Sequence, residues 1–241
     1  MPPTVVFVPC FSGAPWDLRP FGMLGSWPVR LLTLPSTDDL EAYGDWLQEA
    51  TADLERFVLL GDSFGAAIAL SLASRSPRGL VAVAASGGFA CNPLRQASLA
   101  FMARNGPHLA GGLYEQVVLP FHGRLLASPF DRTGEHPWGI EDTVRLFRAH
   151  TPASDYWSRA RAAVNYDLRP RLGAIRVPTL LLSPADDRLI AKRSSAPLGG
   201  IPGARQLRLP GTGHMFRFSH PMLYGNAIRT FLDEVASDGT K

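Results

Sequence analysis

A buried strand that turns abruptly into a helix of small residues is the feature that most constrains this chain. The apolar run 57–60 leads into Gly61-Asp62-Ser63-Phe64-Gly65, and alanine-rich sequence follows. In so tight a turn a side chain at position 61 or 65 would collide with neighbouring backbone, and glycine avoids that collision. The G-x-S-x-G pattern therefore predicts a strained turn that presents Ser63 as a nucleophile. An ordinary helix N-cap is the alternative interpretation of Ser63.

The expected position of Ser63 at the start of a helix adds an electrostatic argument. Free N–H groups and the helix dipole at a helix N-terminus favour developing negative charge. The backbone N–H of Phe64 is therefore predicted to stabilise the oxyanion that forms when Ser63 attacks a carbonyl carbon.

Other apolar runs indicate a parallel sheet that is covered on both faces. Short β-branched or aliphatic segments lie at 4–8, 30–34, 56–60, 80–85, 177–182 and 204–209. Most are apolar along their whole length, which is typical of parallel strands buried on both sides. Helical stretches are expected at 37–52, 63–74 and 221–235. The sequence therefore predicts an α/β fold with a doubly wound, mostly parallel sheet.

The alternation of strands and helices stops between residues 91 and 165. This stretch has helical pieces at 94–104, 140–150 and 154–164, separated by glycine and proline, and no convincing strand. We expect a core formed by residues 1–90 and 166–241, with residues 91–165 inserted as a helical cap. Aromatic residues of the cap are expected to pack within it, and a few of them to line an apolar acyl pocket.

Charge and cysteine content argue against several classes of protein. The 24 basic and 21 acidic residues give a net charge of +3 without a basic block, so no nucleic-acid partner is expected. Cys10 and Cys91 lie in apolar surroundings, lack metal-site spacing and are expected to be buried free thiols. No apolar run is long enough to span a membrane and no signal-peptide pattern begins the chain, so we expect a cytoplasmic protein.

A serine nucleophile needs a base, and six histidines compete for that role. His214 lies in the glycine-rich segment 209–215, between the last expected strand and the final helix. His220 directly precedes Pro221 and is expected to help cap that helix. We predict His214 as the base, because the remaining histidines fall in the expected cap, away from the strand ends: His108, His122, His136 and His150.

The base in turn needs a carboxylate that orients it. Asp186 and Asp187 both follow the expected strand 177–182 and precede His214, which satisfies the chain order Ser, Asp, His. One of the two can simply serve the turn. The local pattern alone leaves both open.

Together these segments resemble the α/β-hydrolase superfamily from residue 5 to near the end of the chain, apart from the cap. The stretch Ile175-Arg176-Val177-Pro178-Thr179-Leu180 and the following loop are similar to the family's I-x-V-P-T-L strand and G-x-x-D-x-x-[VI] acid loop. This resemblance implies Asp187 as the acid. The loop after the first strand resembles the family's H-G-x oxyanion loop, with Pro9 and Cys10 in place of His-Gly, and implies Phe11 as a second backbone oxyanion donor.

The resemblance implies a serine hydrolase that cleaves small to medium acyl esters or thioesters, free or carrier-bound, through a Ser63–His214–Asp187 triad. No metal or cofactor is required for this chemistry. Two other activities of the same triad remain open, which are hydrolysis of carbon–carbon bonds and acyl transfer to an acceptor other than water. A ligand-binding module on a hydrolase scaffold is the alternative that is not an enzyme.

Overall fold

The computed structural model describes residues 2–106 and 108–238, and its centre is one parallel sheet. The strand order is β2-β1-β3-β4-β5-β6, and every neighbouring pair is parallel. The strands are β1 (Thr4–Val8), β2 (Val29–Leu31), β3 (Phe57–Asp62), β4 (Leu80–Ser86), β5 (Thr179–Asp186) and β6 (Arg205–Gly213). The predicted doubly wound α/β fold is confirmed.

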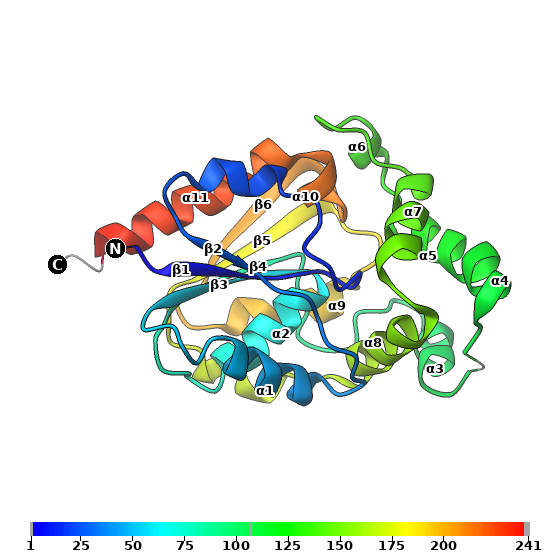
Figure 1. The fold of residues 1–241 in the computed structure, drawn as a ribbon, viewed down its shortest axis with the longest axis horizontal. Helices are drawn as coiled ribbons and strands as arrows, with labels where there is room; N and C mark the ends of the chain where they lie inside the picture. Colours follow the sequence, from blue (N-terminus) through cyan, green and yellow to red (C-terminus); the bar gives the residue numbers. More distant parts are fainter. Residues whose placement is uncertain (1, 107, 239–241) are drawn as a thin grey trace.

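Helices cover both faces of the sheet (Figure 1). One face packs against α1 (Leu40–Ala50) and α2 (Phe64–Ala73), and the other against η1 (Arg19–Leu24) and α11 (Pro221–Asp238). Successive residues of β1 point to opposite sides, so Val6 and Val8 join the first of these cores while Val5 and Phe7 join the second. Burial on both faces is the reason why the strands are apolar throughout.

The chain between β4 and β5 is helical and lies beyond the carboxyl ends of the strands (Figure 1). Its main elements are α3 (Ala97–Asn105), α4 (Gly111–Leu113), the π-helical turn η2 (Tyr114–Val118), α5 (Leu119–Leu126), α6 (Pro129–Arg132), α7 (Ile140–His150) and α8 (Ala153–Asn165). Part of this segment packs on loops of the sheet through a shared apolar cluster that includes Phe147, Met215 and Phe218. The division at residues 90/91 and 165/166 remains a prediction.

The remaining short elements complete the return to the sheet and the approach to the last helix. They are η3 (Arg169–Ala174), α9 (Lys192–Ser195), η4 (Ala196–Gly200) and α10 (Phe216–Ser219). The N-terminus of α11 is capped from a distance, because the Glu135 carboxylate accepts hydrogen bonds from the backbone N–H groups of Met222 and Leu223. The hydroxyl of Ser219, which precedes this helix, donates to Asp131.

Two strands, β5 and β6, extend further along the chain than the apolar runs at 177–182 and 204–209 suggest. β5 continues past Leu182 to Asp186, and the register of its pairing with β6 shifts between Pro184 and Asp186. Proline cannot donate to the ladder, so a shift of register at this point is expected. The extension brings the loop that contains Asp187 to the carboxyl edge of the sheet.

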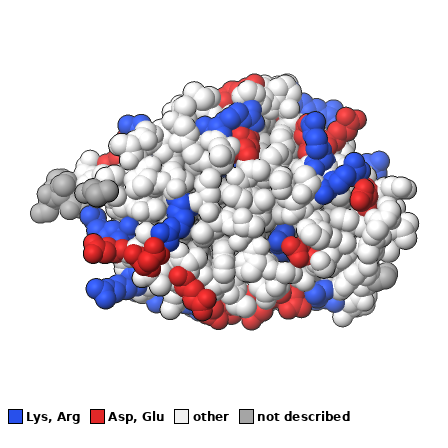
Figure 2. Space-filling view, viewed as in Figure 1, with Lys and Arg blue, Asp and Glu red and all other residues white. Residues whose placement is uncertain are grey.

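Charged residues on the face shown in Figure 2 are interspersed, with basic and acidic groups side by side. Many charged side chains of the protein form ion pairs, for example Arg75 with Asp45 and Arg205 with Glu234. Across the described residues, no helix combines the length and apolar character that crossing a bilayer requires.

The turn at Gly65 generates a prediction about stability. A Cβ atom at Gly65 would lie 2.2 Å from the carbonyl oxygen of Val8, and backbone cannot move aside cheaply. We expect Gly65→Ala to lower the free energy of unfolding by about 3 kcal/mol, the upper end of the usual cost of overpacking. Urea unfolding monitored by circular dichroism measures this.

Gly173→Ala is the matched control, because a Cβ atom there meets nothing within 4 Å. Its free energy of unfolding should stay within about 0.5 kcal/mol of the wild type. Equal stability of the two variants would contradict the close approach of α2 to β1.

Candidate active site

Ser63 lies at the turn between β3 and α2 in a conformation that is rare for a residue with a side chain. Its φ is 53° and its ψ is −109°. Gly61 and Gly65 allow this turn, because a Cβ at Gly61 would lie 2.5 Å from the carbonyl oxygen of Gly65. Backbone strain of this kind is retained where the surrounding structure enforces it, commonly at functional sites. The Ser63 side chain makes no N-cap hydrogen bond to α2.

The side chain of Ser63 contacts His214 instead. Ser63 Oγ lies 3.0 Å from His214 Nε2, and His214 Nδ1 lies 2.8 Å from Asp187 Oδ2. Nδ1–H donates to the carboxylate, which leaves the lone pair of Nε2 to accept the Ser63 hydroxyl hydrogen. The structure therefore brings together the three side chains singled out from the sequence.

The two neighbouring aspartates have different partners. Oδ1 of Asp187 accepts hydrogen bonds from the backbone N–H groups of Leu189, at 3.0 Å, and Ile190, at 2.8 Å. These bonds fix its carboxylate in the direction of His214. The carboxylate of Asp186 instead accepts from Ser128 Oγ and Arg188 Nε. The geometry favours Asp187 as the partner of the histidine.

Electrostatics strengthen the contact between His214 and Asp187. Burial, the largest single influence, disfavours the charged imidazolium, but the Asp187 carboxylate, with smaller contributions from Asp62 and Asp131, offsets it and raises the pKa of His214 above 6.5. Burial would also raise the pKa of Asp187, yet His214 and the two backbone N–H groups hold that pKa below its ordinary value of 3.8. Asp187 is thus held in its ionised form beside His214.

Phe11 and Phe64 carry the two backbone N–H groups expected to bind an oxyanion. Phe64 is the first residue of α2, and Phe11 follows the end of β1 by three positions. Neither amide donates a hydrogen bond to any other described residue. Cys10 does not adopt a positive φ, so the loop does not require the glycine that is usual there.

The Cys10 thiol is buried close to this site. Burial, with a further contribution from Asp62, raises the pKa of Cys10, so the thiol stays protonated and is a poor nucleophile. Both cysteines are free, but the expectation that both are buried is wrong for Cys91, which is partly exposed.

A buried ion pair next to Ser63 was not anticipated from the sequence. Arg217 Nε donates to Asp62 Oδ2 at 2.9 Å, and both side chains are almost fully buried. The same guanidinium donates to the carbonyl oxygens of Trp16 and Asp17. Arg217 therefore connects the turn at Ser63 with the long loop that follows β1.

Asp131 of α6 reaches the segment on both sides of His214. Its carboxylate accepts hydrogen bonds from the backbone N–H groups of Gly213 and Met215 and from the Ser219 hydroxyl. A Cβ at Gly213 would lie 2.1 Å from this carboxylate, which explains the glycine before the histidine. A side chain from the helical segment thus holds the loop of the base.

Arg159 of α8 holds the other loop of the site. Its guanidinium donates to the carbonyl oxygens of Phe11 and Ser12, and its own charge is paired with Asp155. Gly13 gives the guanidinium its space, because a Cβ there would lie 2.5 Å from Arg159. The bonds to Phe11 and Ser12 join residues that are far apart in the sequence, so no local pattern signals them.

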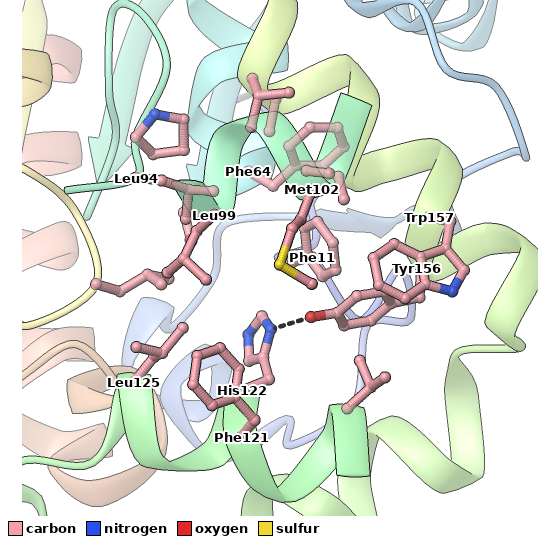
Figure 3. A pocket seen from close by; sticks show the side chains of 18 of the residues that line it. Phe11, Phe64, Leu94, Leu99, Met102, Phe121, His122, Leu125, Tyr156 and Trp157 are labelled. Atoms are coloured by element: carbon pink, nitrogen blue, oxygen red, sulfur yellow. Dashed lines mark hydrogen bonds between the residues drawn. The ribbon is translucent and has the colours of Figure 1, made fainter. Parts of the chain in front are cut away.

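A mostly apolar pocket of about 420 Å³ opens beside Ser63 (Figure 3). Its walls come from Phe11, Ser63 and Phe64 on the sheet side and largely from α3, α5 and α8 on the other. The expectation that the cap histidines lie away from the site is wrong for His122, because tertiary packing of α5 places its ring in this pocket. Among the described residues no group of His, Cys, Asp and Glu could hold a metal ion.

The strand order, the strained serine turn and the Ser63–His214–Asp187 contacts are together those of an α/β hydrolase. The model of the alpha/beta hydrolase family matches residues 5–224. The chain belongs to this family.

The matches to curated relatives cover only part of the length of those proteins. The chain is 32% identical over 183 residues to the polyketide synthase ThaQ of Burkholderia thailandensis, an alignment that covers 73% of this chain and 8% of the synthase. It is 29% identical over 170 residues to the putative carbamate hydrolase RutD of Klebsiella pneumoniae, covering 68% of this chain and 60% of that protein. The chain thus spans less than two thirds of either relative.

Solved structures share the fold at low sequence identity. A hydrolase from Pseudomonas aeruginosa superposes with a TM-score of 0.76 at 21% identity, covering 96% of this chain and 90% of that one. An enol-lactonase from Burkholderia xenovorans gives a TM-score of 0.69 at 21% identity, covering 97% and 92%. At these identities the likeness concerns the fold alone.

The pKa of His214 generates a prediction about pH dependence. A histidine acts as base only when neutral, so activity falls as the pH drops through its pKa, which Asp187 raises above 6.5. We expect Asp187→Asn to move this acid limb to lower pH, because burial then dominates, and to lower kcat/KM about 10³–10⁴-fold. The pH profile of p-nitrophenyl acetate hydrolysis measures both effects.

Asp186→Asn is the control, because its carboxylate bonds to Ser128 and Arg188 rather than to His214. It should keep the position of the acid limb and most of the activity. Similar losses in the two variants would remove the basis for assigning Asp187.

Proposed function

We propose that the chain is a serine hydrolase that cleaves carboxylic esters or thioesters of small to medium acyl groups. The observation that carries the proposal is the line of contacts from Ser63 Oγ through His214 to Asp187 at the wall of an apolar pocket. A hydroxyl with a base in hydrogen-bond reach, itself oriented by a carboxylate, is the arrangement that activates serine for attack on a carbonyl carbon.

The first half of the reaction forms an acyl-enzyme. Ser63 Oγ attacks the ester carbonyl carbon while His214 Nε2 takes the hydroxyl proton, and Asp187 stabilises the resulting imidazolium. The carbonyl oxygen becomes an oxyanion that accepts hydrogen bonds from the unpaired N–H groups of Phe11 and Phe64. Collapse of this intermediate expels the alcohol or thiol, which takes the proton from His214.

The second half releases the acid. Water attacks the Ser63 ester and gives a proton to His214, and the same two N–H groups stabilise the second oxyanion. Collapse returns the proton to Ser63 Oγ and frees the carboxylic acid. The apolar pocket of about 420 Å³ supports an acyl chain of small to medium length as the bound part of the substrate.

The names of related proteins are compatible with hydrolysis at such a carbonyl. One relative is named a putative carbamate hydrolase and one structural neighbour an enol-lactonase, and a lactone is a cyclic ester. Carbamates and lactones therefore belong in a substrate panel beside open-chain esters.

Replacement of Ser63 tests the proposal. We expect wild-type protein to hydrolyse p-nitrophenyl esters, with kcat/KM varying systematically from acetate to dodecanoate, and Ser63→Ala to lose at least about 10⁴-fold in kcat. Release of p-nitrophenolate, thiols from matched thioesters, and acid from lactones measures the activity.

Ser195→Ala is the matched control, because this half-buried serine of α9 does not line the pocket and its hydroxyl donates to the Lys192 carbonyl. It should hydrolyse the panel like the wild type. Retained activity in Ser63→Ala would contradict the proposal, and so would tight binding of the esters by wild-type protein without turnover.

A further inference from the structure

The walls of the pocket beside Ser63 contain few polar side-chain atoms. Among the described residues that line it, nitrogen or oxygen is present in the side chains of Ser63, His122, Tyr156 and Trp157. The Trp157 indole N–H is already used, because it donates to the carbonyl oxygen of Leu109 at 2.9 Å. His122 and Tyr156 are therefore the polar groups left for a bound acyl chain to meet.

These two side chains come from different helices and point toward one another (Figure 3). His122 of α5 and Tyr156 of α8 are joined by a hydrogen bond of 2.8 Å between Nδ1 and the phenol oxygen. The imidazole lies against the ring of Phe11, at a centroid distance of 5.6 Å, and against Phe147, at 4.8 Å. Aromatic packing and the hydrogen bond together fix the orientation of the imidazole.

The protonation of the pair determines what it can offer. Burial, with a smaller contribution from His214, lowers the pKa of His122 to about 3, so the ring is neutral and carries one N–H. Burial raises the pKa of Tyr156, which therefore keeps its O–H. The pair therefore has two polar hydrogens, one on the imidazole and one on the phenol. One of them forms the hydrogen bond between the two side chains.

In either tautomer one hydrogen of the pair has no acceptor in the described part of the chain: the phenol hydrogen if Nδ1–H donates to Tyr156, or Nε2–H if the phenol donates to Nδ1. Leaving a buried donor unpaired is unfavourable. Nε2 is open to the pocket, where a bound molecule can supply the acceptor, so we assign the phenol O–H as the donor to Nδ1 and place the N–H of the imidazole on Nε2.

Nε2 faces the pocket. Among the described residues Nε2 has no hydrogen-bond partner, and the atom is not fully buried. Because the His122 side chain is only 8% exposed, the open side of Nε2 is the pocket that the ring lines. His122 also shares a smaller cavity with Ser63 and His214, so its ring lies near the two groups that are proposed to react with the ester.

We propose that His122, held in one tautomer by Tyr156, selects acyl groups that carry a hydroxyl or carbonyl oxygen within the first few carbons from the ester carbonyl. This inference rests on the proposed function. A plain alkyl chain would displace water from Nε2–H and leave the donor unpaired, whereas an oxygenated chain supplies an acceptor. Sites built to hydrogen-bond a substrate oxygen discriminate against analogues that lack it.

The test compares ethyl hexanoate with its hydroxy and oxo derivatives at successive carbons, using pH-stat titration. The quantity measured is the ratio of kcat/KM for the best oxygenated ester to kcat/KM for ethyl hexanoate. Comparing this ratio between variants cancels the intrinsic reactivity of each ester. We expect His122→Phe, which keeps a ring between Phe11 and Phe147, to lower the ratio about tenfold, the effect of one neutral hydrogen bond.

Tyr156→Phe provides a second variant, because it keeps the ring and removes the group that fixes the tautomer. Tyr156→Phe should also lower the ratio of kcat/KM values, and it tests the inference if His122→Phe does not fold. Tyr114→Phe is the matched control: it removes a buried hydroxyl that donates to Thr151, from a ring that packs on Tyr156 but does not line the pocket. The ratio in Tyr114→Phe should equal that of the wild type.

The outcomes separate this inference from the proposed function. If wild-type protein hydrolyses ethyl hexanoate and the ratio is the same in wild type, His122→Phe and Tyr156→Phe, His122 does not select oxygenated acyl groups, while the proposed function stands. If wild-type protein hydrolyses none of the esters, nor the p-nitrophenyl esters, the proposed function itself fails.

Discussion

The close approach of the N-terminus of α2 to the end of β1 is the constraint on which the rest of the site depends. Gly65 lies so near the Val8 carbonyl that no side chain fits between them, and Ser63 accepts a φ of 53° to make the turn. The same approach places the loop after β1 beside the serine. Two unpaired backbone N–H groups, those of Phe11 and Phe64, are thereby available next to a hydroxyl that bonds to His214.

The helical segment between β4 and β5 contributes to the site as well as covering it. Asp131 holds the backbone on either side of His214, and Arg159 holds the carbonyl groups of Phe11 and Ser12. Both are buried side chains, so their hydrogen bonds are costly to lose and stiffen the loops they join. The positions of the base and of one oxyanion donor thus depend on how this segment packs. The hydrogen-bonded pair of His122 on α5 and Tyr156 on α8 makes the proposed selection of substrate depend on the same packing.

The features predicted from the sequence are those with local causes. Crowding at the turn involves residues a few positions apart, so the G-x-S-x-G pattern was sufficient to indicate Ser63, and burial on both faces made the strands recognisable. Asp187 could not be separated from Asp186 by pattern, because the distinguishing N–H groups of Leu189 and Ile190 depend on the folded loop. The expectation that His122 lies away from the site was wrong for a related reason. A lone histidine on a helix has no local signature, and its position results from the packing of α5 against α8 and Phe11.

Reaction with a fluorophosphonate probe shows directly whether Ser63 is activated, because a serine with a neighbouring base reacts much faster with the probe than an ordinary hydroxyl does. The intact protein is treated with the probe, digested and analysed by peptide mass spectrometry. The account predicts one modification, on Ser63, and its loss when His214 is replaced by alanine. Modification of another residue, or an unmodified Ser63 in folded wild-type protein, would contradict it.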